Sequence, residues 1–189
     1  MSNNGTVTGR EEDSMKRLMV VAVVLVLLAG CGGETGRARE YMKEGDKIQA
    51  ELATGSSELA TSMPKARSNV KDAAAMQKAA EDVKALTADL DAKADKAIVL
   101  FEKIEGLSGV EDYKKYATIQ IKADKVTKDM LVVINKFLDE LVAMASSGNA
   151  TEEQAAKATE TYRNNLGESI EKMMEAETEA DQLKKDKKL

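Results

Sequence analysis

The sequence contains no histidine, no tryptophan, one cysteine and one proline among its 189 residues. Without an imidazole, catalytic triads of the serine or cysteine type lack their general base. Zinc, haem and di-iron sites in helical proteins ordinarily use histidine or several cysteines, so the composition argues against them as well. A single cysteine excludes an internal disulfide. We therefore expect a protein that is not an enzyme, with no metal site and no diffusible cofactor.

The charge pattern gives no basic surface for nucleic acid. Lysine and arginine number 28 against 33 aspartate and glutamate residues, for a net charge of −5, and both signs are mixed along the chain. A nucleic-acid-binding domain usually shows a concentrated basic patch. The glycines of the segment 32–36 do not form a phosphate-binding loop, because they lie in a predicted tether. We expect no nucleic-acid partner.

The longest apolar stretch lies near the N-terminus. Lys16 and Arg17 precede 12 uninterrupted apolar residues, 18–29, and small residues follow them. A basic region, a short apolar region and small residues at its end are typical of a secretory signal peptide. A transmembrane helix needs about 20 apolar residues, so a permanent span is not expected. We predict a signal peptide over residues 15–30.

The end of this segment resembles the signal peptides of prokaryotic lipoproteins. Leu28-Ala29-Gly30-Cys31 matches their lipobox, which is a leucine, two small residues and an invariant cysteine. The resemblance implies a diacylglyceryl group on the thiol of Cys31, cleavage between Gly30 and Cys31, and usually an acyl chain on the new amine. Two or three acyl chains hold a protein durably at a membrane. The resemblance covers residues 15–31 only, and no family is recognised for the mature domain.

Lipid on Cys31 would place the mature chain outside the cytoplasm, with membrane lipid as its partner and the covalent lipid as its only attached group. Position 32 is glycine rather than aspartate. In the lipoprotein class this favours the outer membrane where the host has two membranes. Otherwise the outer face of the plasma membrane is expected, and an archaeal host stays open. Met15 is the expected start, which makes residues 1–14 the product of a mis-annotated start codon. The alternative is that they form a genuine extension of the leader.

The mature chain divides into a short tether and one helical domain. Residues 31–36 are glycine-rich after the cysteine and are expected to be a flexible tether. Over residues 37–189 the apolar residues recur at helical spacing. Breaks interrupt this pattern at 62–64, 106–109 and 146–149. The helices are expected at about 37–62, 65–105, 109–146 and 151–186.

Short sequence patterns predict where these helices begin and where one of them packs closely against a neighbour. The first predicted helix carries a heptad-like seam in which Gly45 and Gly55 would let a neighbouring helix approach closely. Pro64 suits the first turn of the second helix, where its missing N–H is not needed. The segments 108–111 and 151–154 read S-x-x-E and T-x-x-Q, which is the capping-box pattern at a helix start.

These features predict an all-α fold, an elongated antiparallel four-helix bundle with up-down-up-down topology and coiled-coil-like packing. Helices of this length give a rod of roughly 55–60 Å. The alternative is a three-helix bundle, with the first helix separate or continuous with the second through a kink at Pro64. With four antiparallel helices, Cys31 and the lysine-rich segment 184–188 would lie at the same end of the rod.

Gln120, Asp124 and Thr127 are the candidate ligand-binding residues. They form a polar line beside the apolar face of the third predicted helix. Turned inward, they would line a pocket. We predict instead that they face water, with Asp124 paired to Lys128 four residues later. An acidic ladder on the fourth predicted helix is interpreted as a solvated face rather than a calcium site, and its members are Glu168, Glu171, Glu175 and Glu179.

The sequence is compatible with two candidate functions. The first is a membrane-anchored, non-catalytic helical module that acts as a binding or spacer element, or as an interaction surface for another envelope protein. The second is a solute-binding or sensor domain with a small-ligand pocket between the helices. A close-packed core with no cavity above about 300 Å³ would argue against the second function, whereas a buried cavity lined by Gln120, Asp124 or a tyrosine would favour it.

Overall fold

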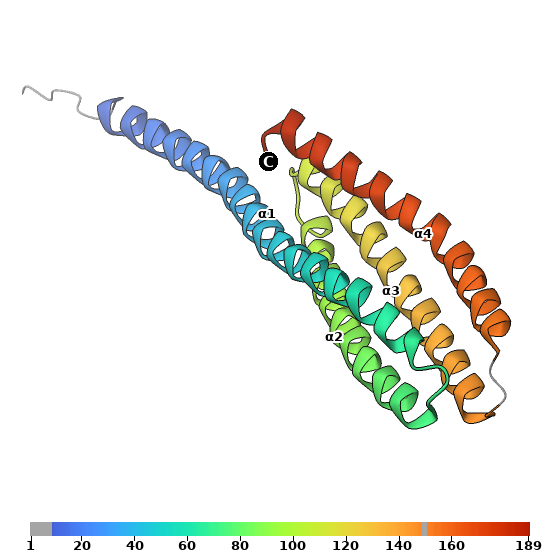
Figure 1. Ribbon diagram of the computed structural model, residues 1–189. Coiled ribbons are helices and arrows are strands. Elements are labelled where there is room, and N and C mark those ends of the chain that lie inside the picture. The colour runs from blue at the N-terminus through green and yellow to red at the C-terminus, as the bar shows by residue number, and fades with distance from the viewer. Residues whose placement is uncertain (1–8, 149–150) are drawn as a thin grey trace, which may run out of the picture.

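The computed structural model describes the backbone of residues 9–148 and 151–189, and the side chains of 33–148, 151 and 153–189. Within these ranges the chain forms four helices and no strand. The prediction of an all-α fold is therefore confirmed. The helices are α1 (Gly9–Ser68), α2 (Ala73–Glu105), α3 (Glu111–Ser146) and α4 (Glu152–Lys187), drawn in Figure 1.

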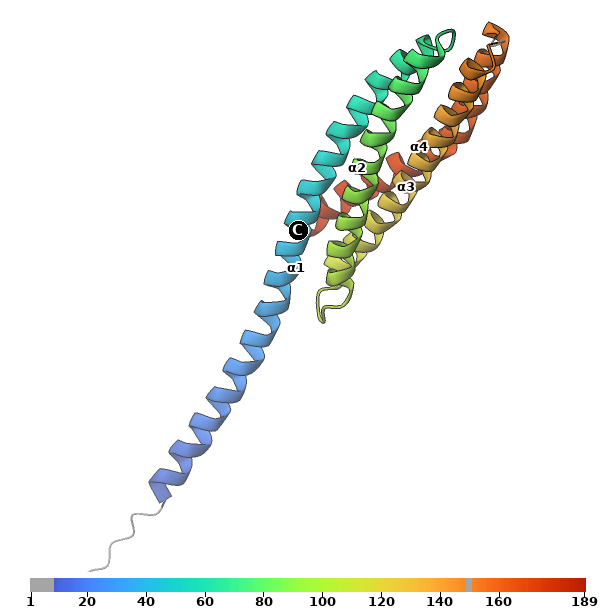
Figure 2. The same ribbon diagram turned by 90° about the horizontal axis from the view of Figure 1, so that it is seen from below.

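The helices follow one another in antiparallel order, as an up-down-up-down bundle requires. α1 packs on α2, α2 on α3 and α3 on α4, and α1 also touches α3. The α2–α3 connection and the C-terminus lie at one end, which we call the base. The α1–α2 and α3–α4 connections lie at the other end, the tip, and the N-terminal part of α1 projects beyond the base (Figures 1 and 2). The four-helix prediction is confirmed, and the three-helix alternative is wrong.

The interior divides into a base core and a tip core. In the base core, the ring of Phe101 packs edge-on to Tyr116, with centroids 6.0 Å apart. The tip core centres on Leu138 and Leu141, which are fully buried. The base core also contains Ala38, Met42, Ile104, Tyr113 and Ala180, and the tip core also contains Leu52, Leu59, Met76, Leu90, Ile134 and Ala158. The fully buried members from α4 are Ala158 and Ala180, and its larger side chains Tyr162 and Leu183 are only partly buried against the cores.

Two glycines let α1 lie close to α2. A Cβ atom on Gly45 would lie 2.5 Å from Cζ of Phe101, and one on Gly55 would lie 2.5 Å from Cδ2 of Leu90. Both distances are far below van der Waals contact. The ring of Phe101 and the side chain of Leu90 therefore occupy the space that a larger residue would fill. This confirms the close approach predicted from the glycines of the seam.

The turn at the tip lies later than the sequence suggested. α1 continues past Pro64 to Ser68, and α2 begins at Ala73 rather than at residue 65. Pro64 is exposed, so the loss of its N–H donor falls on the solvent side of the helix. Beyond it, Ala66 is still buried, and this packing holds the last turn of α1 in place. Asp72 caps α2 by accepting a hydrogen bond from the backbone N–H of Ala75 at 3.0 Å.

Two further expectations about helix ends are wrong. α1 runs without a break through Gly33 and Gly36, where a flexible tether was predicted, and Arg37 pairs with Glu34 at 3.0 Å across this stretch. α3 begins at Glu111 with Val110 as its N-cap, which makes no side-chain capping bond. The predicted capping box at 108–111 does not form, and the burial of Leu107 and Val110 holds this connection in place instead.

The capping box at the start of α4 forms as predicted. The N–H of Gln154 donates to Oγ1 of Thr151 at 3.2 Å, and the N–H of Thr151 donates to Oε1 of Gln154 at 3.0 Å. Each bond satisfies a donor that has no partner within the helix. α4 therefore has a well-defined start at the tip.

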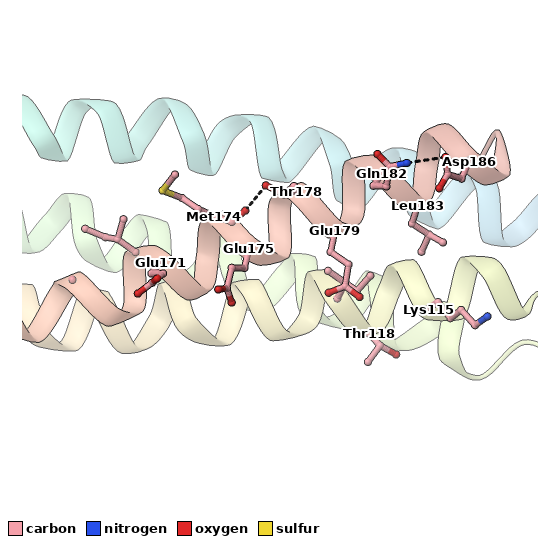
Figure 3. A pocket seen from close by; sticks show the side chains of 13 residues that line it. Lys115, Thr118, Glu171, Met174, Glu175, Thr178, Glu179, Gln182, Leu183 and Asp186 are labelled. Carbon is pink, nitrogen blue, oxygen red and sulfur yellow. Dashed lines mark hydrogen bonds between the residues drawn. The ribbon is translucent and has the colours of Figure 1, made fainter.

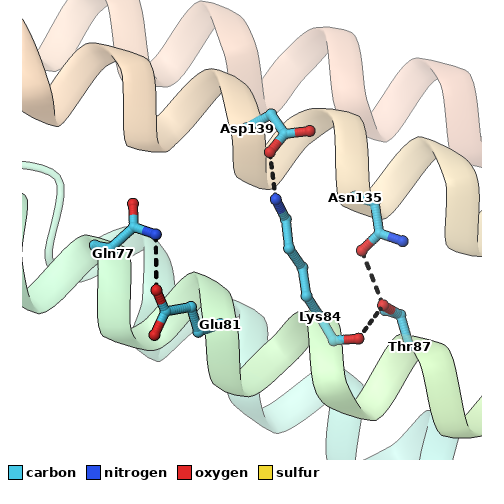
Figure 4. A network of polar contacts seen from close by, with 6 residues as sticks. All are labelled: Gln77, Glu81, Lys84, Thr87, Asn135 and Asp139. Carbon is cyan, nitrogen blue, oxygen red and sulfur yellow. Dashed lines mark hydrogen bonds and ion pairs between the residues drawn. The ribbon is translucent and has the colours of Figure 1, made fainter.

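Polar side chains align α2 with α3 along the tip half of the bundle (Figure 4). Lys84 of α2 pairs with Asp139 of α3. One turn away, Oγ1 of Thr87 lies 2.8 Å from Oδ1 of Asn135, and Thr87 is only 1 % exposed. A buried hydroxyl needs such a partner to offset the loss of its contacts with water. The hydroxyl also lies 2.9 Å from the carbonyl oxygen of Lys84, so it has an acceptor within α2 as well, and the contact with Asn135 adds a polar link between the two helices.

Candidate functional site

A polar network joins three helices at the base. Asp46 of α1 lies at its centre: its Oδ1 accepts a hydrogen bond from Oη of Tyr116 at 2.5 Å, and its Oδ2 accepts one from Nζ of Lys184 at 2.8 Å. Nε2 of Gln120 donates to Oη of Tyr116 at 3.1 Å. Lys184 also lies over the ring of Tyr116, 5.5 Å from its centroid. The network therefore connects α4 to α1 through α3.

The environment of Tyr116 keeps its hydroxyl protonated. Burial raises the pKa of Tyr116 above its ordinary value, and the hydrogen bond to the carboxylate of Asp46 raises this pKa further. A neutral phenol can donate to a carboxylate, whereas a phenolate would repel it. Tyr116 is thus a fixed donor in the network rather than a general acid or base.

Asp124 is the most deeply buried carboxyl group that the structure describes. It is 1 % exposed, its Oδ1 accepts a hydrogen bond from Nε2 of Gln49 at 2.8 Å, and its Oδ2 has no hydrogen-bond partner among the residues whose side chains are described. Burial raises the pKa of Asp124 to about 7, and the bond from Gln49 lowers it by a smaller amount. A carboxyl group in this setting changes its charge near neutral pH.

The polar line on α3 does not lie as predicted. Gln120 and Asp124 are buried against α1 instead of facing water, and Lys128 pairs with Asp91 and Asp95 of α2 at 3.1 and 2.5 Å. Thr127 is half-buried on the other side: its Oγ1 bonds to the carbonyl of Ala123 at 3.1 Å and lies 3.7 Å from Sδ of Met173. The three candidate residues therefore do not line one common pocket.

Thr127 instead lines a groove between α1 and α4, which we call the α1–α4 groove. Among the described residues, no Cα atom of α1 comes within 8 Å of one of α4, so the two helices do not close over α3. The groove has a volume of about 400 Å³. Its apolar lining consists of Leu59, Ala60, Met63 and Pro64 of α1, Met130, Leu131, Ile134 and Phe137 of α3, and Tyr162, Leu166, Ile170 and Met173 of α4.

Aromatic stacking forms part of the groove floor. The rings of Phe137 and Tyr162 lie 4.4 Å apart between centroids at 13° to each other. Burial raises the pKa of Tyr162 above its ordinary value, so its hydroxyl also stays protonated. A stacked pair of this kind is a rigid apolar surface that loses little conformational entropy when a ligand binds.

Two arginines lie at the tip end of the groove. Arg67 in the last turn of α1 and Arg163 of α4 both line it, and both are exposed. Neither has an acidic partner within 4.0 Å in the part of the chain whose side chains are described. No pattern in the sequence pointed to these two arginines, to Asp46 or to Gln49.

A second, wider groove lies between α3 and α4 near the base (Figure 3). It has a volume of about 1120 Å³ and is broadly open to solvent. Glu171, Glu175 and Glu179 of the acidic ladder line it, and Glu168 pairs instead with Lys172 at 2.6 Å. Two large apolar residues of α4, Ile170 and Met174, are exposed here at 39 and 59 %. The acidic ladder thus borders an apolar strip on α4.

Neither a metal-binding cluster nor a helix suited to span a membrane is found among the described residues. No group of three or more Cys, Asp or Glu side chains among them is arranged to hold a metal ion. None of their helical segments combines the length and the apolar character that a bilayer span requires. Cys31 and the apolar run 18–29 lie outside the residues whose side chains are described, so the lipobox stays a prediction from sequence.

Comparisons with models of known protein families, with curated proteins and with solved structures found no match for this chain.

Proposed function

We propose that this chain is a lipoprotein, attached to a membrane through lipid on Cys31, whose helical bundle is a non-catalytic interaction module outside the cytoplasm. The observation that carries the proposal is the lipobox Leu28-Ala29-Gly30-Cys31 directly after 12 apolar residues that follow a basic pair. A short apolar region before a cysteine in this setting has no role in a folded core. Its partners would be membrane lipid and, at the far end, another envelope protein.

The shape of the bundle is compatible with this attachment. From Cys31 to Ala38, the first buried residue that the structure describes, α1 advances roughly 10 Å. An anchor at Cys31 would therefore bring the base near the membrane and hold the tip away from it. The α2–α3 connection and the C-terminal lysines also lie at the base. Lysines near an anionic surface contribute about 1 kcal/mol each, but Lys184 and Lys187 already pair with Asp46 and Asp112.

The test is lipid labelling of the full chain in its own cells. Wild-type protein should incorporate a labelled fatty acid and sediment with membranes, and its N-terminus should be a modified Cys31. The Cys31→Ala variant should lose the label and accumulate unprocessed or in the soluble fraction. Gly36→Ala, outside the lipobox, is the matched control and should behave as wild type. Unchanged processing and membrane retention of Cys31→Ala would refute the proposal.

The α1–α4 groove favours a second candidate function, the binding of a small ligand between the helices. Its volume of about 400 Å³ falls within the roughly 300–1,000 Å³ of small-molecule sites. A tyrosine, Tyr162, lines it, and apolar side chains form most of its wall. Thermal unfolding of the purified full chain, measured with and without candidate apolar ligands, tests this function independently of the anchor.

A further inference from the structure

The α1–α4 groove is apolar along its length and cationic at one end. Its floor and walls are formed by aliphatic, methionine and aromatic side chains from three helices. At the opposite end from Arg67 and Arg163, the hydroxyl of Thr127 is already bonded to the carbonyl of Ala123. The charged side chains that line the groove therefore lie only at its tip end, and its other polar groups are the hydroxyls of Ser56, Thr127, Thr159 and Tyr162.

The two guanidinium groups suit an anionic group. Arg67 and Arg163 come from different helices and line the same groove, and they also line the shallow depression next to it. Guanidinium binds carboxylate through two parallel hydrogen bonds, which adds geometric specificity to the charge attraction. Glu160 lines the depression as well but lies more than 4.0 Å from either guanidinium. Both arginines are thus available to a ligand.

The length of the groove and its single charged end suit one extended ligand chain. The groove runs from Ser56 to Arg67 on α1 and from Thr159 to Met173 on α4, which corresponds to roughly 16–21 Å of helix. A narrow apolar ligand with one charged end matches this length and the position of Arg67 and Arg163 at one end of the groove.

We propose that the α1–α4 groove binds one long-chain fatty acid, with its alkyl chain on the apolar floor and its carboxylate between Arg67 and Arg163. This inference deepens the ligand-binding function proposed above and names its ligand class. It does not require acylation of Cys31, so the labelling test of the anchor and the test below can fail separately.

The experiment is photolabelling of the full chain with a diazirine-bearing palmitate. Labelling is carried out in whichever cell fraction contains the protein, so the result does not depend on the anchor. After irradiation and digestion, the adducts are mapped by mass spectrometry. They should concentrate in 56–67 of α1 and 159–173 of α4. Adducts spread evenly over the chain, or confined to the α3–α4 groove, would overturn the proposal.

Two pairs of variants separate the apolar floor from the charged end. Ala60→Trp fills the groove from an exposed position and should abolish the adducts, whereas Ala53→Trp, exposed on the same helix outside the groove, should preserve them. The double variant R67Q/R163Q should lower the apparent affinity for palmitate by about 10- to 100-fold. A control that removes the same charge from exposed positions outside the groove, R39Q/K157Q, should leave the affinity unchanged.

The methyl ester of the same probe decides the role of the carboxylate. It should label wild type weakly and should show no difference between wild type and R67Q/R163Q. Equal labelling by acid and ester would overturn the assignment of the arginines. Stronger labelling of the groove by a diazirine-bearing lysophospholipid than by palmitate would overturn the choice of ligand. Equal labelling of Ala60→Trp and wild type would show that the groove is not the site.

Discussion

Asp46 of α1 and Lys184 of α4 are joined at 2.8 Å although 138 positions separate them in the sequence. This pair holds the C-terminal part of α4 against α1 at the base. Toward the tip no comparable contact between the two helices is found among the described residues, and the α1–α4 groove opens there. The two helices are therefore joined by polar contacts at the base and separated by the apolar α1–α4 groove toward the tip.

The central position of Asp46 predicts a large effect of its removal. Asp46→Ala deprives both Tyr116 and Lys184 of their acceptor and leaves the buried hydroxyl of Tyr116 with one fewer partner. Hydrogen bonds to a charged group contribute about 1.5–3 kcal/mol each, so we expect the free energy of unfolding to fall by about 2–3 kcal/mol. Urea denaturation followed by circular dichroism measures this change.

Lys184→Met is the control for Asp46→Ala. It removes a pair whose side chains are 34 and 27 % exposed, and it leaves the bond from Tyr116 to Asp46 intact. We expect a loss of at most about 1 kcal/mol, because solvent screens such a pair. Equal effects of the two variants would mean that the bond from Tyr116 contributes nothing to stability.

The same substitution should affect stability very differently at two positions on α3, because one lies in the tip core and the other is exposed. Leu138→Asp places a carboxylate at a position that is 0 % exposed and has no partner for it, so the variant should lose its cooperative unfolding transition. Val132→Asp introduces the same group at a position that is 51 % exposed. It should change the free energy of unfolding by only about 0.5 kcal/mol. A native-like melting curve for Leu138→Asp would contradict the assignment of the core.

Apolar spacing was sufficient to predict the helix number and topology, since four amphipathic segments with short connections have few other arrangements. The same reasoning failed at Gln120 and Asp124. The buried positions of α3 follow spacings of three and four from Tyr113 through Gln120 to Asp124, and the next buried position is Leu131, about two turns later. Their register therefore indicated burial, but their polar character suggested solvent. Burial is possible because each polar group finds a partner in the folded chain. Gln49 of α1 donates to Asp124, and the hydroxyl of Tyr116 accepts from Gln120.

The grooves and the tip turn were not predictable for a different reason. Whether α1 and α4 close over α3 depends on the summed volume of side chains at the seam, and periodicity carries no such information. α4 contributes mainly alanine to the cores, which in retrospect favours an open seam. At the tip, Pro64 suggested a helix start, whereas packing of Ala66 kept it within α1.

Replacing a helical glycine with alanine usually stabilises a protein, but we expect the opposite at Gly45. Gly36→Ala in the same helix meets nothing within 4 Å and should raise the free energy of unfolding by about 0.5–1 kcal/mol. Gly45→Ala places a methyl group 2.5 Å from the ring of Phe101, so it should lower that free energy by about 1–3 kcal/mol. Denaturant titrations of both variants give the comparison. A stabilised Gly45→Ala would mean that α1 and α2 are farther apart.

Asp124 predicts how stability depends on pH. Its pKa is about 7 in the folded chain and about 3.9 in an unfolded one, so between these values the folded state binds the additional proton. The stability that this proton contributes is fully present below about pH 4 and is lost as pH rises toward 7. The loss is on the order of a few kcal/mol, since each pKa unit corresponds to about 1.4 kcal/mol.

Asp124→Asn tests this dependence because an amide keeps the shape of the side chain and does not titrate. The difference in unfolding free energy between Asp124→Asn and wild type should grow in favour of the variant from pH 4 to pH 7 and stay constant above about pH 8. Asp89→Asn, which alters an exposed pair with Lys93 at 2.7 Å, is the control and should change the free energy of unfolding by at most about 1 kcal/mol. Urea titrations at several pH values supply these differences. Parallel curves for Asp124→Asn and wild type would show that Asp124 is ionised in the folded protein, and hence that water or a cation reaches its Oδ2.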